Sequence, residues 1–127
     1  MERIKAIYNR EVVNIKSTQE IVRIIAEAAA AKKALDITVL DIRDVSILAD
    51  YFVICSGSSS TQVKSIADEI KKRMQEIGYV LDHVEGYKEE KWILLDYLDV
   101  VVHVFHTRER EFYNLEKLWG DARVLAF

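Results

Sequence analysis

Residues 51–78 read YFVICSGSSSTQVKSIADEIKKRMQEIG, and they decide the fold. The first five are apolar and too few for a helix, which predicts a strand over 51–55. A glycine-serine turn follows, and Ser59 with Gln62 has the capping-box spacing that opens a helix. Gly78 favours a helix end because glycine readily adopts the left-handed conformation. Between these two signals, apolar residues recur at helical spacing and predict a buried face: Val63, Ile66, Ala67, Ile70, Met74 and Ile77.

A helix and another strand are predicted upstream of this unit. Ser17 and Glu20 form a capping box, in which the hydroxyl accepts from the third helical amide and the carboxylate reaches back to the amide of the cap. Residues 37–40 are apolar and β-branched and predict a strand, and residues 41–50 predict a turn or loop. The apolar stripe of the first helix extends to about Leu35: Ile21, Ile24, Ile25, Ala28, Ala31 and Leu35.

Downstream, residues 80–85 predict a strand and residues 86–91 a charged turn. Residues 92–96 and 100–105 are strongly apolar with little alternation, and a short turn separates them, which predicts a hairpin whose strands are buried on both faces. Thr107 is the predicted cap of a last helix. One side of this helix is apolar and a glycine ends it: Phe112, Leu115, Leu118, Trp119 and Gly120. The whole order predicts the α/β fold class, with a mixed β-sheet of about five strands and helices packed on it.

The composition fits one globular domain. Half of the 127 residues are hydrophobic and 31% are charged, and the absence of proline argues against a proline-rich linker. Cys55 is the single cysteine, so no intramolecular disulfide forms, and its place at the end of an apolar strand assigns it to the core. No segment stays apolar long enough to span a membrane. We therefore expect a soluble, intracellular protein.

The charge pattern argues against a dedicated binder of nucleic-acid backbones. The 18 Lys and Arg residues against 21 Asp and Glu residues give a formal net charge of −3. The acidic excess is local, because residues 82–99 hold six acidic and two basic side chains. Direct DNA binding is therefore not expected.

The turn at Gly57 has two readings. Free amides at a helix N-terminus can cradle a phosphate, but Gly57 is the only glycine of the turn and no Walker lysine follows it. Simple helix capping is therefore favoured over anion binding. A strand, a glycine-serine turn and a helix also occur in nucleotidyltransferases, which need closely spaced carboxylates on a following strand to hold magnesium.

Such a carboxylate pair is missing from the sequence. Asp68 and Glu69 lie within a helix, and Asp96 and Asp99 flank a turn, so neither pair alternates on one face of a strand. His103 and His106 are three residues apart, which on a strand points the two rings to opposite faces. One buried histidine and one exposed histidine at the helix entry are favoured over metal ligation. No catalytic residue, cofactor or metal site is predicted.

Trp92 also has two readings. It opens a strand directly after an acidic turn, so it is either a core residue or an exposed anchor of the kind enriched at protein interfaces. The residues alone favour the core. The same alternatives apply to Tyr97 and Leu98 at the predicted hairpin tip, where an exposed leucine is an unusual choice for a turn.

Seven blocks of sequence follow one another between about Thr18 and Trp119. They are residues 50–54 (DYFVI), 56–57 (SG), 62–68 (QVKSIAD), 85–86 (EG), 92–97 (WILLDY), 99–105 (DVVVHVF) and 110–119 (REFYNLEKLW). In this order and at these separations the chain resembles the ribosomal silencing factor family, also called Iojap-like. The resemblance leaves residues 1–16 as an N-terminal extension of unknown role and residues 17–127 as a single domain.

The resemblance implies a function. Members of this family bind the large ribosomal subunit through the fourteenth protein of the large-subunit series, L-fourteen, which lies on the inter-subunit face. They block joining of the small subunit and so slow translation when nutrients are scarce. The resemblance thus implies a cytoplasmic translational repressor and not an enzyme. It also implies a homodimer and a nucleotidyltransferase-like fold without the catalytic acids.

The resemblance also implies a binding surface. The family's tryptophan corresponds to Trp92, and the adjoining Asp96 and Tyr97 fall within the surface that contacts the ribosomal protein. Leu98 completes this candidate site at the hairpin tip, where many members have glycine. Two alternatives stay open: a nucleotidyltransferase-like enzyme that uses the Gly57 turn, and a dimeric scaffold whose last helix packs against its own copy.

Overall fold

The computed structural model describes residues 17–118, 120 and 122–125. Six strands form one mixed sheet in the order β3-β4-β5-β2-β1-β6, in which β2 and β5 are parallel and every other neighbouring pair is antiparallel. The strands are β1 (Leu35–Asp41), β2 (Tyr51–Gly57), β3 (His83–Glu85), β4 (Trp92–Asp96), β5 (Val100–His106) and β6 (Arg123–Leu125). The helices are α2 (Thr18–Ala31), α3 (Ser60–Glu76), α4 (Thr107–Tyr113) and α5 (Leu115–Leu118). The predicted α/β class is confirmed, with six strands described where about five were expected.

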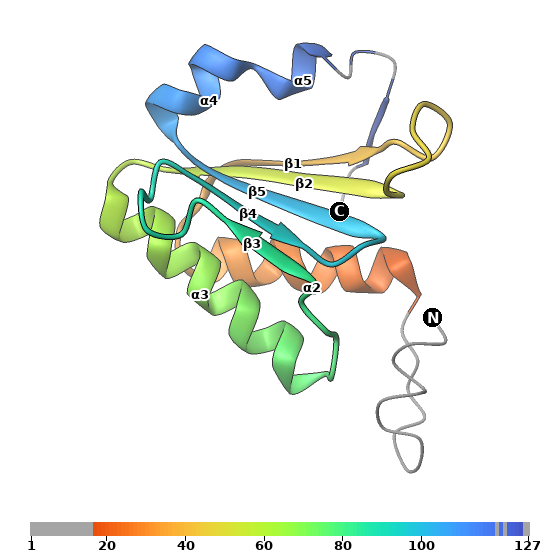
Figure 1. Cartoon of the computed structure of the whole chain (residues 1–127), viewed down its shortest axis with the longest axis horizontal. Coiled ribbons are helices and arrows are strands. Elements are labelled where there is room, and N and C mark those ends of the chain that lie inside the picture. The colour runs from red at the N-terminus through yellow and green to blue at the C-terminus, as the bar shows by residue number, and fades with distance from the viewer. Residues whose placement is uncertain (1–16, 119, 121, 126–127) are drawn as a thin grey trace.

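Helices lie on both faces of the sheet (Figure 1). The inner face, as we call it, is covered by α2 and α3, and the outer face carries α4 and α5 over one end of the sheet. The main core lies under α2 and α3 and includes the whole predicted face of α3 except the half-buried Ile77. Cys55 is in this core, as predicted, and burial raises the pKa of its thiol to about 12. A smaller core on the outer face holds Leu40, Ile42, Ala49, Ile54 and Phe105.

The start of α2 is confirmed in detail, but its end is not. The Glu20 amide donates to Ser17 Oγ at 3.2 Å, and the Ser17 amide donates to Glu20 Oε1 at 2.8 Å. The helix ends at Ala31, because Lys33 adopts a left-handed conformation with φ of 61°. Leu35 is therefore not the last residue of a buried stripe. It opens β1, where it pairs with Ser56 and is half exposed.

The hairpin of β4 and β5 forms as predicted, but its two strands are buried differently. Nearly all of β5 is buried, because it is a central strand with cores on both faces. In β4, by contrast, buried and half-buried residues alternate. The prediction of burial on both faces is therefore wrong for β4. The predicted strand over 80–85 shortens to β3, which pairs with β4 from His83 onward.

The predicted last helix is wrong in three respects. His106 and not Thr107 is the N-cap of α4, since His106 Nδ1 accepts from the Arg108 amide at 3.2 Å. Asn114 adopts the left-handed conformation, with φ of 48°, and divides the segment into α4 and α5. Third, Phe112 is largely exposed and does not lie on a buried side of the helix. Separately, β6 pairs with β1 where no strand was predicted. Trp119 lies outside the described residues.

Candidate functional site

The candidate site is on the outer face of β4, near the edge of the sheet. Successive strand residues point to opposite faces, so Trp92, Leu94 and Asp96 share the outer face while Ile93 and Leu95 enter the main core. We call Trp92, Leu94 and Asp96, together with Leu98 in the turn that follows, the β4 face. The two faces of β4 thus separate a buried structural side from a side that a partner can reach.

Trp92 is half-buried, between the two positions that the sequence allowed. Its indole stacks on Phe105 with ring centroids 4.8 Å apart, and Tyr113 of α4 lies at the same centroid distance on a tilted ring. Indole Nε1–H donates to His103 Nδ1 at 3.1 Å. The ring is therefore fixed by its neighbours and keeps part of its surface exposed, which is the arrangement of a preorganised anchor.

His103 is 4% exposed and holds the indole in place. Because its Nδ1 accepts from Trp92, the proton of the neutral ring is on Nε2, which has no hydrogen-bond partner among the described residues. Phe52 packs against the imidazole at a centroid distance of 4.7 Å in an edge-on arrangement. Burial lowers the pKa of His103 to about 4. The predicted buried histidine is confirmed in His103, and His106 is at the helix entry as predicted but is half-buried where an exposed side chain was expected.

The turn after β4 presents Leu98 and hides Tyr97. The Leu98 amide donates to Asp96 Oδ1 at 2.7 Å, and Leu98 is 46% exposed with φ of 73°. This left-handed conformation strains a leucine, because glycine is the residue that adopts it without steric cost. Tyr97 is only 1% exposed, packs near Tyr79, and its burial raises its pKa. The tyrosine side chain therefore belongs to the core and offers no contact surface of its own, a correction to its place in the expected binding surface.

Gly86 explains one of the sequence blocks. It has φ of 77°, and a Cβ at this position would lie 2.0 Å from the carbonyl oxygen of Trp92. No side chain fits against the strand backbone at that distance. The turn over 86–91 can therefore lead the chain directly into Trp92 only if residue 86 is glycine.

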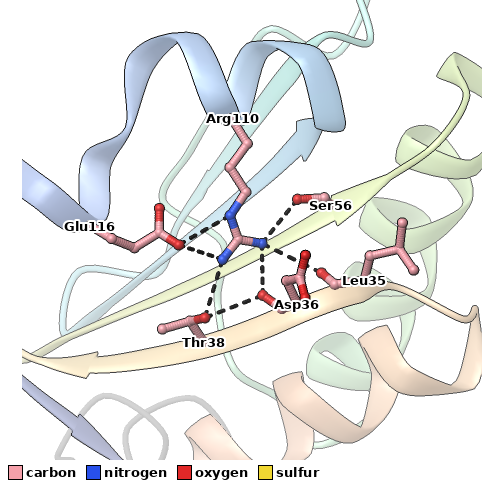
Figure 2. Close-up of polar contacts among 6 residues, drawn as sticks. All are labelled: Leu35, Asp36, Thr38, Ser56, Arg110 and Glu116. Carbon is pink, nitrogen blue, oxygen red and sulfur yellow. Dashed lines mark hydrogen bonds and ion pairs between the residues drawn. The ribbon is translucent and has the colours of Figure 1, made fainter.

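Arg110 fastens the α4–α5 segment to the sheet (Figure 2). Its guanidinium donates to the Asp36 carbonyl at 2.7 Å, to Ser56 Oγ at 2.9 Å, to Thr38 Oγ1 at 3.1 Å and to Glu116 of α5. No residue of α4 is fully buried, so this polar cluster holds the helix together with the contact between Tyr113 and Trp92. We call it the Arg110 clamp. Sequence reasoning missed it, because its partners on β1 and β2 are more than fifty residues away.

The alternative phosphate site, at the Gly57 turn and the start of α3, is occupied by a side chain of the protein itself. The Ser58 amide donates to Gln62 Oε1 at 2.7 Å, and Gln62 Nε2 donates to the Lys33 carbonyl at 3.0 Å. Ser59 caps the helix through the Gln62 amide at 3.1 Å. The amide that would bind a phosphate is thus already paired, which favours capping over anion binding. Among residues 17–118, 120 and 122–125, no three His, Cys, Asp or Glu side chains gather as metal ligands would.

Acidic groups border the β4 face. On the adjoining edge strand β3, Glu85 pairs with Leu94, and His83 pairs with Asp96. His83 Nε2 and Glu85 Oε2 are 2.7 Å apart, and this contact raises the pKa of the histidine. The β4 face is thus an apolar strip that contains one aromatic ring and has acidic neighbours.

Within the described part of the chain, no helix is long and apolar enough to cross a lipid bilayer.

Comparison with known proteins identifies the family. A family model described as ribosomal silencing factor during starvation matches residues 15–126. The chain belongs to the ribosomal silencing factor family. The ribosomal silencing factor RsfS of Bacillus subtilis is 52% identical over 104 residues, which cover 82% of this chain and 88% of that protein. The RsfS of Halalkalibacterium halodurans is 49% identical over 106 residues, which cover 84% and 91%.

Solved structures show the same fold. A crystal structure of a Chromobacterium violaceum protein has a TM-score of 0.81 at 34% identity and covers 83% of this chain and 88% of its own. A crystal structure of a Bacillus halodurans protein has a TM-score of 0.78 at 43% identity, with coverage of 87% and 100%. The chloroplastic Iojap protein of Zea mays is 38% identical over 101 residues, 42% of its length. The predicted membership of the ribosomal silencing factor family is thereby confirmed.

Proposed function

We propose that this chain is a translational repressor that binds the large ribosomal subunit and prevents the small subunit from joining it. Membership of the ribosomal silencing factor family supports this, and the relatives from Bacillus subtilis and Halalkalibacterium halodurans are named ribosomal silencing factors. The direct contact is the inter-subunit-face protein L-fourteen. The chain acts in the cytoplasm as a homodimer and uses no cofactor.

The observation that carries the proposal is the fixed indole of Trp92 on the β4 face. An aromatic ring held by His103 and Phe105 loses little conformational freedom when a partner covers it, so its burial contributes strongly to affinity. Asp96 at the other end of β4 and Glu85 on the adjoining strand add negative charge to this face and attract a basic ribosomal protein. Leu94 and Leu98 supply further apolar area.

Repression by this route needs no chemical step. A domain that covers the joining face excludes the small subunit by its volume alone. An enzyme of the nucleotidyltransferase kind would bind phosphate at the start of α3. In this chain the side-chain amide of Gln62 lies there and accepts from the Ser58 amide. The β4 face is built for association, because it combines a rigid anchor with charge that guides an encounter.

Co-sedimentation with purified large ribosomal subunits tests the proposal. We expect the wild-type chain to travel with the subunits at moderate salt and to inhibit their joining with small subunits. Trp92→Ala should weaken binding by about 2 kcal/mol or more, roughly 30-fold, as loss of a central aromatic anchor does. Val124→Ala, an exposed valine on the opposite edge strand, is the matched control and should bind like wild type.

Two results would contradict different parts of the proposal. If the wild-type chain stays in the supernatant or leaves joining unhindered, repression through the large subunit is wrong. If a folded Trp92→Ala chain binds as tightly as wild type, the β4 face is not the contact. Since the indole also packs on Phe105 and Tyr113, circular dichroism must show that the variant is folded. Trp92→Phe, which retains a ring, should show a smaller loss.

A further inference from the structure

The loop between β1 and β2 displays apolar side chains to solvent. Ile47 is fully exposed and Leu48 is 82% exposed, while Ile42 and Ala49 at the base of the same loop are buried in the outer-face core. Neighbouring large aliphatic side chains at a loop tip add nothing to the stability of the fold, because they bury no area there. Such a display marks a surface for another molecule.

The loop is held in shape by its own hydrogen bonds. The amides of Val45 and Ser46 donate to the Ile42 carbonyl at 3.1 and 2.9 Å, and the Leu48 amide donates to Ser46 Oγ at 3.0 Å. At the base, the Ile42 amide donates to the Asp50 carbonyl at 2.9 Å. The apolar tip is therefore preorganised, so covering it costs little additional ordering.

The same hydrogen bonding joins this loop to the turn that carries Leu98. The amides of Asp50 and Tyr51 donate to the Asp99 carbonyl at 2.8 and 3.1 Å. The loop and the β4–β5 turn thus leave the sheet side by side at one end, where Figure 1 shows both. Leu98, the last residue of the β4 face, is 46% exposed there. Ile47 and Leu48 are therefore displayed at the same end of the sheet as Leu98.

Charge selects the kind of partner. The loop and the turn carry Asp44, Asp50, Asp96 and Asp99. The nearby cations Arg43 and Arg123 both contact Asp41, at 2.7 and 2.9 Å, and the hydrogen bonds from Arg43 hold the pKa of Asp41 well below its usual range. An acidic rim around aliphatic side chains repels nucleic acid and a second copy of the same edge, and it fits a basic protein that has an apolar recess.

We propose that Ile47 and Leu48 form, with Leu98, a second anchor through which the chain docks on a basic protein of the large subunit. This inference rests on the proposed function and extends its contact surface beyond β4. Trp92 lies at one end of β4 and Leu98 follows the other end. The first anchor, Trp92, and the second anchor would therefore contact the partner at separated points. Two separated contacts fix the orientation of the repressor as well as its affinity.

The test compares paired serine variants for binding to purified large ribosomal subunits. Ile47→Ser with Leu48→Ser should weaken binding at least about tenfold without lowering the midpoint of thermal unfolding, because both side chains are exposed. Val80→Ser, at an exposed valine between α3 and β3, is the control and should bind like wild type. A photo-crosslinking residue at position 48 of the full chain should attach to a protein of the subunit.

The outcomes separate this inference from the proposed function. If wild type and Trp92→Ala behave as proposed but the paired serine variant binds as tightly as wild type, the second anchor is wrong and the function stands. A crosslink only to ribosomal RNA, or only to a second copy of the chain, also overturns it. If the wild-type chain does not bind the subunits at all, both the function and this inference fall.

Discussion

A single hydrogen bond between Trp92 and His103 sets the protonation state of the histidine. An indole N–H can only donate, so His103 Nδ1 must carry a lone pair, and a doubly protonated imidazole has none to offer. Protonation would also place a charge among the rings of Phe52, Trp92 and Phe105. The fold therefore favours the neutral ring, and the orientation of the indole depends on it.

This preference predicts how the free energy of unfolding depends on pH. The folded pKa of His103 is about 4 and its ordinary value is 6.5, so in this interval the unfolded chain binds more protons than the folded one. Stability from this group is fully present above pH 6.5 and falls as the pH drops towards 4. Between about pH 7.5 and about pH 5, wild type should lose about 2 kcal/mol more than His103→Gln.

Urea unfolding at the two pH values measures this difference. His103→Gln is the informative variant because its amide oxygen can still accept from the indole, while the side chain does not titrate in this range. Parallel loss of stability in wild type and His103→Gln would show that the buried histidine is not the responsible group. Carboxylates such as the paired Asp41 also make the free energy of unfolding depend on pH. Their contribution is the same in wild type and in His103→Gln, so it cancels in the comparison.

At the scale of elements, the outer-face helices are attached differently from α2 and α3. The inner-face helices α2 and α3 each bury five residues, whereas α4 buries no residue fully and is held by the Arg110 clamp. A clamp of hydrogen bonds depends on geometry, since a guanidinium serves several acceptors at once and a lysine ammonium cannot reproduce its planar fork. The position of Tyr113 against Trp92 therefore depends on Arg110.

Arg110→Lys should loosen α4 and α5 while leaving the rest of the domain folded. We expect amide hydrogen exchange in residues 107–118 to become at least about tenfold faster, because several charge-assisted bonds are lost, while exchange in α3 stays unchanged. Arg108→Lys is the matched control, because Arg108 is exposed on the same helix. Equal acceleration in both variants, or acceleration throughout the sheet, would contradict a local role for the clamp.

The elements that could be predicted from sequence are those that local signals specify. The capping residues Ser17 and Ser59 and the left-handed Gly78 act within one turn of chain, and all three were predicted correctly. The pairing of β6 with β1 could not be predicted, because only distant backbone groups specify it. The break at Asn114 was missed because an apolar stripe spanned it.

The candidate site follows the same division. The resemblance placed Trp92 and Asp96 on one surface, and both lie on the outer face of β4, whereas the apolar pattern alone had predicted a strand without alternation. Whether Trp92 is buried, exposed or held between the two depends on Phe105, His103 and Tyr113, which are 11 to 21 residues further along the chain. The spacing of apolar residues along the chain does not show which distant side chains contact one another. The burial of Tyr97 was missed for the same reason.

At the scale of the whole molecule, the acidic excess is local. Residues 82–99, which include β3, β4 and the turn after β4, hold six acidic and two basic side chains, whereas α2 and α3 together carry five of each sign. The net charge of −3 conceals this local excess. A protein with one acidic region is turned by the field of its partner before contact, so a basic ribosomal protein would draw that region first.

Association kinetics at varied ionic strength test this orientation. Asp96→Asn with Asp99→Asn should slow association with large subunits roughly three- to tenfold at low salt, and should make the rate less sensitive to added salt. After Asp96→Asn the side-chain amide oxygen at position 96 can still accept from the Leu98 amide, so the turn persists. Glu27→Gln with Glu76→Gln removes the same amount of charge from exposed positions on α2 and α3 and should leave the rate nearly unchanged. If both double variants slow association equally, net charge alone governs the encounter. If only Asp96→Asn with Asp99→Asn slows it, the acidic end of the sheet meets the partner first.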